Sequence, residues 1–412
     1  MLEIARKAKE ASPVLASLSS KEKDAFLLRL AEKLMEEKGR ILEANALDLE
    51  RAKASSMKQS LLDRLALNEK RIKDMARGLR DIAALPDPVG EVIDGTRRPN
   101  GLLVTRVRVP LGVVAIIYEA RPNVTIDSVG LCVKSGNAVI LRGSSSALSS
   151  NRALVRVVHD VLRECSLPEG CVGLVESESH EDVKFLLSLR EYIDVAIPRG
   201  GAELIRTVVE NARVPVIETG VGNCHVYVDE TADLDMAERI VVNAKTQRPS
   251  VCNACETLLV HGRVAPAFLP RIVSALQAEG VEVRGCERTR QLVPGVVPAS
   301  EEDWYTEYLD LIIAVRVVDS LDEAIRHINT YGSHHSDAIV TSDYSRAMEF
   351  LSKVDSAAVF VNASTRFTDG GEFGMGAEIG ISTQKLHARG PMGLRELTTW
   401  KFVVYGSGQI RE

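Results

Sequence analysis

From Val113 onward, short runs rich in valine and isoleucine alternate with segments of roughly 10–15 residues that have helical periodicity. A strand buried on both faces needs no polar side, so continuous apolar runs of this kind are typical of parallel β-α-β units. The first series of runs is GVVAIIY, NAVILRG, GCVGLVE, YIDVAIPRGG and VPVIETG. A second series begins near Asp229 and contains ETLLVHG, GVEVRG, DLIIAVRVVDS, SDAIVTSD and AAVFVNAS. The alternation therefore predicts two α/β halves, with a boundary between Asp229 and Asp235.

Segments outside these two series complete the predicted organisation. From Leu2 to about Leu85 the pattern is helical, and Ser19 with Glu22 forms a capping box at one helix start. The segments LLVTRVRVP and TTWKFVVYG alternate like strands but have no evident partner in either half. Strands left over in this way often pair within an oligomer or between subunits, so we expect a small β arm and a homo-oligomer.

The composition narrows the class of function. Of the 412 residues, 45% are hydrophobic and 26% are charged, an ordinary globular balance that excludes disordered and low-complexity classes. The net charge is −6 and no basic run is interleaved with aromatic residues, which argues against a nucleic-acid partner or an anionic membrane surface. The first segment, LEIARKAKEAS, lacks the apolar stretch of a secretory signal. Seven scattered cysteines form no disulfide framework, so we expect a cytoplasmic protein. Because the charge argues against nucleic acid and membrane, we expect the protein to act on a small molecule.

The segment AKTQRPSVCNACETLLVHG is the densest cluster of candidate chemistry. Cys252 lies on a polar, proline-interrupted turn between a predicted helix and a predicted strand, where a thiol can meet a substrate. The thiolate is the nucleophile, and Arg248 and neighbouring backbone N–H groups would lower its pKa. Cys255 adds a C-x-x-C, but no second pair has zinc-site spacing and the histidines show no ligand spacing, so we predict no metal. An inert buried cysteine is the alternative for each thiol.

Three further candidate sites follow predicted strands, and their residues suit base catalysis, anion binding or nucleotide binding. Glu218 comes directly after an apolar run and would be partly desolvated there, which makes it a candidate base or ligand-binding group. Arg142 ends the run AVILRG just before a hydroxyl-rich helix start, which is either an anion site or an ordinary helix cap. If a dinucleotide bound there, Arg142 would suit a ribose 2′-phosphate and so NADP. Gly200 and Gly201 lie between a strand and a helix, again suited to a nucleotide.

The stretch NASTRFTDGGEFGMGAEIGISTQKLHARG is long, polar and glycine-rich for a compact domain, and loops of that length are usually functional or disordered. Arg366 and Arg389 could bind a substrate carboxylate in bidentate fashion. Ser364 or Thr365 could donate further hydrogen bonds. Solvated surface side chains are the alternative.

The order of these motifs resembles that of the aldehyde dehydrogenase superfamily. The motifs IIYEARPNVT, IPRGG, ETGVGNCH, AKTQRPSVCN, TEYLDLIIA and VNASTRFTDGGEFGMGAEIGISTQ are similar to the branch that acts on γ-glutamyl phosphate in proline biosynthesis. The resemblance implies an α/β, aldehyde dehydrogenase-like fold with two Rossmann-like three-layer α/β/α domains, a helical N-terminal leader and a small β arm. The implied parts are an NADP-binding domain (1–95 and 112–230), a catalytic domain (231–385) and oligomerisation segments (96–111 and 386–412).

Carried over by position, the resemblance implies roles for individual residues. Cys252 matches the nucleophile, Glu218 the general base of hydrolytic members, and Asn123 stands where an amide completes the oxyanion hole. Cys255 is expected to be incidental. For the cofactor, the positions that match the family's binding residues are Arg142 at the adenosine ribose, Gly200 and Gly201 under the pyrophosphate, and Glu307 at the nicotinamide ribose.

The activity that the resemblance implies is NADPH-dependent reduction of γ-glutamyl phosphate to glutamate 5-semialdehyde through a cysteine thioester, with release of phosphate. A contact with the glutamate kinase that makes this unstable substrate is a further expectation. Three alternatives remain open at this point: a hydrolytic aldehyde dehydrogenase, a relative that uses coenzyme A, and a non-catalytic nucleotide-binding protein. No site for coenzyme A is evident in the sequence.

Overall fold

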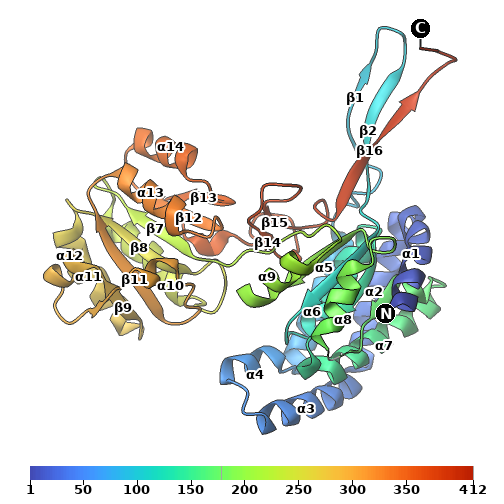
Figure 1. Cartoon of the computed structure of the whole chain (residues 1–412), viewed down its shortest axis with the longest axis horizontal. Coiled ribbons are helices and arrows are strands. Elements are labelled where there is room, and N and C mark those ends of the chain that lie inside the picture. Colours follow the sequence, from blue (N-terminus) through green and yellow to red (C-terminus); the bar gives the residue numbers. More distant parts are fainter. Residues whose placement is uncertain (178, 412) are drawn as a thin grey trace. The chain divides into compact units, whose positions relative to one another are not determined.

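The computed structural model describes residues 1–177 and 179–411, and the chain divides into two compact units that we describe separately (Figure 1). Unit 1 consists of Met1–Thr219, Gly374–Gly380 and Met392–Glu412, and unit 2 of Gly220–Phe373 and Ile381–Pro391. The two predicted α/β halves correspond to these units. The chain passes into unit 2 before the predicted boundary after residue 230, because strand β7 (Cys224–Val228) belongs to the sheet of unit 2.

Unit 1 contains a four-stranded parallel sheet in the order β5-β4-β3-β6. Its strands are β3 (Val113–Tyr118), β4 (Ala138–Arg142), β5 (Val172–Leu174) and β6 (Val195–Arg199). Every residue of β3 and β4 is buried, which explains why these runs are apolar throughout. The connecting helices are α6 (Asn123–Lys134), the short η1 (Ser145–Ala147), α7 (Leu148–Glu164), η2 (Glu169–Cys171), α8 (His180–Ser188) and α9 (Ala202–Asn211).

The helical leader belongs to unit 1. It comprises α1 (Leu2–Ser17), α2 (Ser20–Glu36), α3 (Lys38–Ala54), α4 (Gln59–Leu65) and α5 (Glu69–Ala84). The predicted capping box is present, since the Ser19 side chain accepts from the Glu22 N–H and the Glu22 carboxylate accepts from the Ser19 N–H. Helix α1 contacts β4 and β5 directly, whereas α2, α3 and α5 pack on α6 and α7. The leader therefore forms part of the core of this unit.

One predicted strand of unit 1 is absent. The run VPVIETG forms no strand and has only isolated bridge residues, Val216, which pairs in parallel with Ala196, and Thr219. Gly220 and Gly222 then precede β7. The prediction of a strand over this run was therefore wrong. The reason is that the chain leaves unit 1 here and enters unit 2 at the amino end of its sheet.

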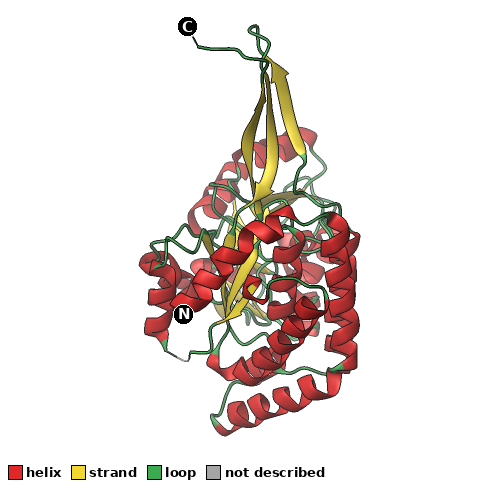
Figure 2. Ribbon diagram, turned by 90° about the vertical axis from the view of Figure 1, so that its right-hand side faces the viewer, coloured by secondary structure: helices red, strands yellow, loops and turns green. Residues whose placement is uncertain are grey.

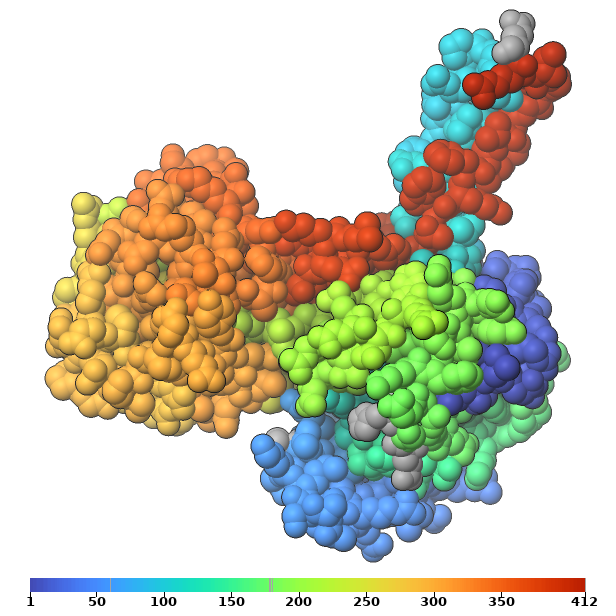
Figure 3. Space-filling view, in the orientation of Figure 1, coloured from blue at the N-terminus to red at the C-terminus, as the bar shows by residue number. Residues whose placement is uncertain are grey.

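A separate antiparallel sheet forms the arm, in the order β1-β2-β16. Its strands are β1 (Val92–Arg97), β2 (Leu103–Pro110) and β16 (Thr398–Tyr405). The two strands that lacked a partner in the sequence pair with each other along their full length, from Thr398 opposite Pro110 to Tyr405 opposite Leu103. Strands β1 and β2 form an antiparallel hairpin, and Figures 2 and 3 show β16 lying along it. Residues 386–391, predicted with the arm, belong to unit 2, where β15 (Gly390–Pro391) pairs with β14 (Ile381–Ser382).

Unit 2 is built on a seven-stranded parallel sheet in the order β10-β9-β11-β8-β7-β12-β13. The strands after β7 are β8 (Cys255–His261), β9 (Glu282–Gly285), β10 (Val297–Pro298), β11 (Ile312–Val318), β12 (Ser336–Val340) and β13 (Ala358–Val361). The helices and turns are α10 (Leu234–Thr246), α11 (Ala265–Ala278), α12 (Glu287–Leu292), η3 (Glu302–Tyr305), α13 (Leu321–Tyr331), α14 (Tyr344–Lys353) and η4 (Thr365–Phe367).

Two hydrophobic clusters cover opposite faces of this sheet. Val226 and Leu258 pack with α10 and α11, whereas the next residue on each strand, Tyr227 and Leu259, packs with α13 and α14. Because successive side chains of a strand point to opposite faces, this division makes unit 2 a three-layer α/β/α sandwich, as predicted.

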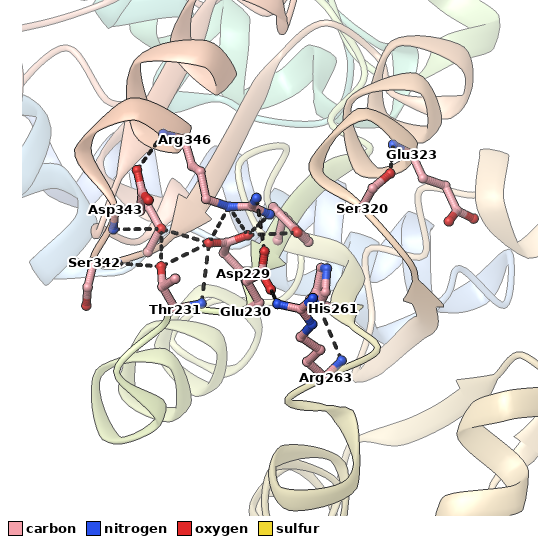
Figure 4. A network of polar contacts seen from close by, with 12 residues as sticks. Asp229, Glu230, Thr231, His261, Arg263, Ser320, Glu323, Ser342, Asp343 and Arg346 are labelled. Atoms are coloured by element: carbon pink, nitrogen blue, oxygen red, sulfur yellow. Dashed lines mark hydrogen bonds and ion pairs between the residues drawn. The ribbon is translucent and has the colours of Figure 1, made fainter.

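A network of polar side chains lies at the carboxyl edge of the same sheet (Figure 4). Asp229 follows β7 and accepts from Arg346 Nε at 2.9 and 2.8 Å and from Thr231 Oγ1 at 3.0 Å. Arg263 pairs with Glu230 beside it. The charges of this network are paired with one another, so it joins β7 to the start of α14. Among the described residues, no helix is long and apolar enough to cross a bilayer.

Candidate active site

Cys252 lies on the loop between α10 and β8, at the amino edge of the unit 2 sheet. Its side chain is half-buried and forms no disulfide, as is true of all seven cysteines. Cys255, three residues later, is fully buried as the first residue of β8, and this burial raises the pKa of its thiol to about 12. A thiol that stays protonated and inaccessible is a poor nucleophile, which supports the prediction that Cys255 is incidental.

A third thiol lies beneath the Cys252 loop. Cys224, the first residue of β7, donates its S–H to the Cys252 carbonyl with 3.2 Å between sulfur and oxygen, and its sulfur lies 3.7 Å from His335 Nδ1. Burial, together with Asp337 and Cys252, raises the pKa of Cys224 well above its usual value of 9.0. Cys224 therefore remains a neutral thiol that holds the backbone of the nucleophile.

Gly222 joins Cys252 to Glu307. The Gly222 N–H donates to Glu307 Oε1 at 2.6 Å. A Cβ on Gly222 would lie 1.4 Å from the Cys252 carbonyl oxygen, so only glycine fits between the two backbones. The predicted nucleophile and the predicted ribose-binding carboxylate are thus neighbours within one unit.

A buried ion pair binds the loop that carries Glu307. Lys245 Nζ lies 2.6 Å from Glu256 Oε2, and both side chains are fully buried. The other oxygen, Glu256 Oε1, accepts from the Leu309 N–H at 3.2 Å. Leu309 has a left-handed backbone (φ 54°), a conformation that a residue with a branched side chain adopts only when its surroundings enforce it. Burial raises the pKa of Glu256, with Lys245 opposing the effect.

The segment from Ser364 to Thr368 wraps around the residue that follows the nucleophile. Asn253 donates its side-chain amide to the carbonyl oxygens of Thr368 (2.9 Å) and Arg366 (3.3 Å). Thr365 Oγ1 donates to the Asn253 carbonyl at 2.7 Å, and Ser364 Oγ accepts from the Arg366 N–H at 3.3 Å. Both hydroxyls are buried and shape the loop. Their proposed contact with substrate has no direct support in this geometry.

Arg366 itself stands beside the nucleophile. Its Nε donates to Gln247 Oε1 at 2.8 Å and its Nη1 donates to Asn253 Oδ1. Burial and the nearby Arg248 lower the pKa of Arg366, while Cys252 and Asp369 act in the opposite direction. Arg248 and the thiol of Cys252 are therefore both within electrostatic range of Arg366.

Arg389 has a different environment. Its Nη2 donates to the backbone carbonyl (3.0 Å) and the carboxylate (2.9 Å) of Asp355, and Lys385 lies 2.7 Å from the same carboxylate. These contacts hold the pKa of Asp355 at about 2. An arginine whose charge already has a carboxylate partner in the chain is less suited to a substrate than Arg366.

The other two catalytic candidates lie in unit 1. Asn123 is the first residue of α6 and donates its amide to Asp127 Oδ2 at 3.0 Å. Burial raises the pKa of Asp127 to about 6, with Asn123 and Arg199 opposing the shift. Glu218 is half-buried on the segment that leads out of unit 1.

The cofactor candidates of unit 1 gather at the carboxyl edge of its sheet. The order β5-β4-β3-β6 reverses direction between β3 and β6, and ligands of open α/β sheets bind at such a switch point. Gly200 and Gly201 follow β6 there, and a Cβ on Gly200 would lie 2.6 Å from the Glu119 carboxyl carbon. Gly201 donates its N–H to Glu119 Oε1 at 3.1 Å and opens α9. Sequence patterns did not indicate Glu119, since its partner is 82 residues away.

Arg142 ends β4 at the same edge. Its side chain is buried, Nη2 donates weakly to the Ser179 carbonyl at 3.4 Å, and Nε has no hydrogen-bond partner in the described chain. Burial lowers the pKa of this guanidinium, and Asp182 partly offsets the effect. A buried donor without a partner is destabilising, so this position fits an anionic ligand group such as the phosphate of a dinucleotide. Within residues 1–177 and 179–411, no group of three or more His, Cys, Asp or Glu side chains could hold a metal ion.

Sequence comparison relates these features to known proteins. The model of the "Aldehyde dehydrogenase family" matches residues 1–294 and 292–403. The chain is 63% identical over 411 residues to the "Gamma-glutamyl phosphate reductase" of Carboxydothermus hydrogenoformans, covering 100% of this chain and 99% of that protein.

Comparison with solved structures leads to the same family as the sequence comparison. The crystal structure of a γ-glutamyl phosphate reductase from Thermotoga maritima superposes with a TM-score of 0.98 at 56% identity, covering 100% of this chain and 99% of that one. An acetylating aldehyde dehydrogenase from Geobacillus thermoglucosidasius shares the fold, with a TM-score of 0.71 at 17% identity over 100% of this chain and 97% of that one.

Proposed function

The chain belongs to the aldehyde dehydrogenase family, and on this premise we propose that it reduces γ-glutamyl phosphate to glutamate 5-semialdehyde with NADPH and releases phosphate. This reaction is the second step of proline biosynthesis. The observation that carries the proposal is the presence of Cys252, half-buried and beside Glu307 and Arg366, in a chain that matches γ-glutamyl phosphate reductases over its full length. Family membership implies a nicotinamide cofactor.

Cys252 performs the acyl transfer. Its thiolate attacks the γ-carbonyl carbon, the C–O bond to phosphate breaks, and a thioester remains on the enzyme. The backbone N–H of Cys252 is the proposed donor to the oxyanion in unit 2, and one such donor is worth about 10²–10³ in rate. The role of the Asn123 amide stays an expectation from the family resemblance. Cys224 and Gly222 keep the Cys252 peptide in place through the contacts described above. Glu218 need not activate water, because the acyl group leaves as an aldehyde.

The cofactor, when bound, supplies the hydride that converts the thioester to the thiohemiacetal, which then collapses to the aldehyde. In unit 1, Arg142 would bind the adenosine ribose phosphate and the Gly200–Gly201 turn would lie under the pyrophosphate. In unit 2, Glu307 would hold the nicotinamide ribose. The unpartnered Nε of Arg142 supports NADPH over NADH, because a guanidinium matches a phosphate dianion better than a ribose hydroxyl.

The test is NADPH oxidation in the presence of glutamate kinase, ATP and glutamate, together with the reverse reaction from semialdehyde, NADP and phosphate. We expect NADP reduction to depend on phosphate. Phosphate-independent formation of glutamate would instead identify a hydrolytic aldehyde dehydrogenase. Equal kcat/KM values for NADPH and NADH would refute the cofactor preference, and failure of iodoacetamide to label Cys252 would indicate a non-catalytic relative.

Three finer points accompany this proposal. A homo-oligomer assembled through the arm is supported by the exposed aromatic side chains of β16, namely Trp400, Phe402 and Tyr405. A contact with the kinase that supplies the acyl phosphate would shorten the exposure of that unstable substrate to water. The cytoplasmic location stays a prediction.

A further inference from the structure

Arg366 has no carboxylate partner, unlike three other partly buried arginines of the chain. Arg346 pairs with Asp229, Arg284 with Asp303, and Arg389 with Asp355. Arg366, by contrast, is held by two neutral amides, those of Gln247 and Asn253. No ion pair to Arg366 occurs in the described part of the chain.

A second arginine stands next to it without any partner. Arg248 is exposed and makes no hydrogen bond or ion pair with a described residue. Arg248 directly follows Gln247, whose side chain accepts from Arg366 Nε at 2.8 Å, so the two arginines lie at the same part of the loop. Consistent with this placement, Arg248 lowers the pKa of Arg366. The acidic groups in range of Arg366 are Cys252, Asp369 and the buried thiol of Cys224. The Asp369 carboxylate already accepts from the Gly371 and Glu372 N–H groups (2.8 and 3.4 Å).

Two like charges held close together are unfavourable unless an anion balances them. The amides of Gln247 and Asn253 occupy Nε and one N–H of Nη1, so the guanidinium of Arg366 keeps further donors for a ligand. Asn253 directly follows the nucleophile in the chain, so its side chain holds the Arg366 guanidinium at the loop that carries Cys252.

We propose that Arg366 and Arg248 form the subsite for the phosphate group of the acyl phosphate, which deepens and rests on the proposed function. The phosphate is bonded to the carbon that Cys252 attacks, whereas the α-carboxylate of a γ-glutamyl group is three carbons further away. A phosphate dianion also matches two guanidinium groups, while a carboxylate matches one. This assignment replaces the expectation that Arg366 binds a substrate carboxylate.

The two arginines then act on the leaving group. As the sulfur–carbon bond forms, the electron pair of the C–O bond departs with phosphate, which takes up a proton from solvent. The guanidinium charges stabilise the negative charge that accumulates on the departing oxygens. In the reverse direction the same pair holds inorganic phosphate for attack on the thioester.

The decisive variant is Arg248→Gln, because Arg248 is exposed and its replacement breaks no hydrogen bond or ion pair with a described residue. In the reverse reaction we expect the KM for phosphate to rise about tenfold, with the KM for semialdehyde within twofold of wild type. Arg366→Lys, which keeps the charge but loses the planar fork, is expected to raise the same KM. The matched control is Arg263→Gln, an equal change of charge at the opposite edge of the unit 2 sheet, which should leave both KM values unchanged.

A second readout needs neither cofactor nor turnover. Inorganic phosphate should slow the alkylation of Cys252 by iodoacetamide in the wild type, and Arg248→Gln should raise the phosphate concentration for half protection about tenfold. An increase in the KM for semialdehyde alone would assign the arginines to the α-carboxylate and overturn the proposal, as would no change in either measurement. If the wild type lacks reductase activity but phosphate still protects Cys252, the proposed function fails and the anion site stands.

Discussion

The substitution Gly222→Ala tests whether the Cys252 loop is positioned by a close contact between two backbones. The added methyl carbon would lie 1.4 Å from the Cys252 carbonyl oxygen and 2.5 Å from its Cα. Carbon and oxygen normally approach no closer than about 3.4 Å, so about 2 Å must open between the two segments. Backbone lies on both sides of the clash, and no flexible side chain can move away to relieve it.

The expected loss of activity follows from the hydrogen bonds that hold Gly222 and from the position of Cys252. Gly222 is tied to Glu307 through its N–H and to Cys224 through its carbonyl, so a shift of Gly222 breaks the Glu307 contact. A shift of Cys252 instead moves the nucleophile. A displacement of 1 Å can cost about 10²-fold in rate, so we expect kcat/KM to fall at least about 10²-fold, or about 2.7 kcal/mol of transition-state stabilisation. Overpacking in a well-packed interior costs about 1–3 kcal/mol of stability, and sometimes more, so the unfolding curve is measured alongside the activity.

The assay compares kcat/KM, the rate of Cys252 alkylation and the thermal unfolding curve of Gly222→Ala with those of Gly78→Ala. Gly78 lies within α5 with nothing inside 4 Å of the added carbon, so that control should keep full activity and gain about 0.5–1 kcal/mol. A Gly222→Ala enzyme with kcat/KM within threefold of wild type would show that the contact does not position the nucleophile.

Three further predictions concern the thiols, one carboxylate and the arm. Cys252→Ala should abolish reduction while Cys255→Ala largely retains it, because burial raises the pKa of Cys255 to about 12; the opposite result in the coupled assay would transfer the nucleophile. The pKa of Asp355 is held at about 2 in the folded chain, below its usual 3.8, so this carboxylate stabilises the fold above about pH 4 and the contribution is lost as the pH falls towards 2. The urea midpoint should therefore fall less steeply over this interval in Asp355→Asn than in wild type, and parallel curves would contradict the assignment. Phe402→Glu should dissociate the oligomer in sedimentation at micromolar concentration, since Phe402 is 60% exposed on β16; an unchanged mass would rule out that surface.

Several features were predictable because they depend on neighbours in the sequence. The apolar runs of β3 and β4 indicate strands buried on both faces. Ser19 and Glu22, three residues apart, mark the start of a helix. The turn that carries Cys252 was recognisable from its proline and polar residues. The run VPVIETG, however, has the same apolar character and makes only isolated bridges, because the chain leaves one sheet for another at that point.

The sequence by itself determined most of the secondary structure, the two α/β halves and the candidacy of Cys252, since periodicity, capping and turn chemistry act over a few residues. Only the tertiary structure decided which remote groups meet. It pairs β2 with β16 across almost 300 residues, presses Gly222 onto Cys252, and buries Lys245 with Glu256 under the Leu309 backbone. Such contacts depend on how elements pack, and packing joins residues whose spacing along the chain has no regular pattern.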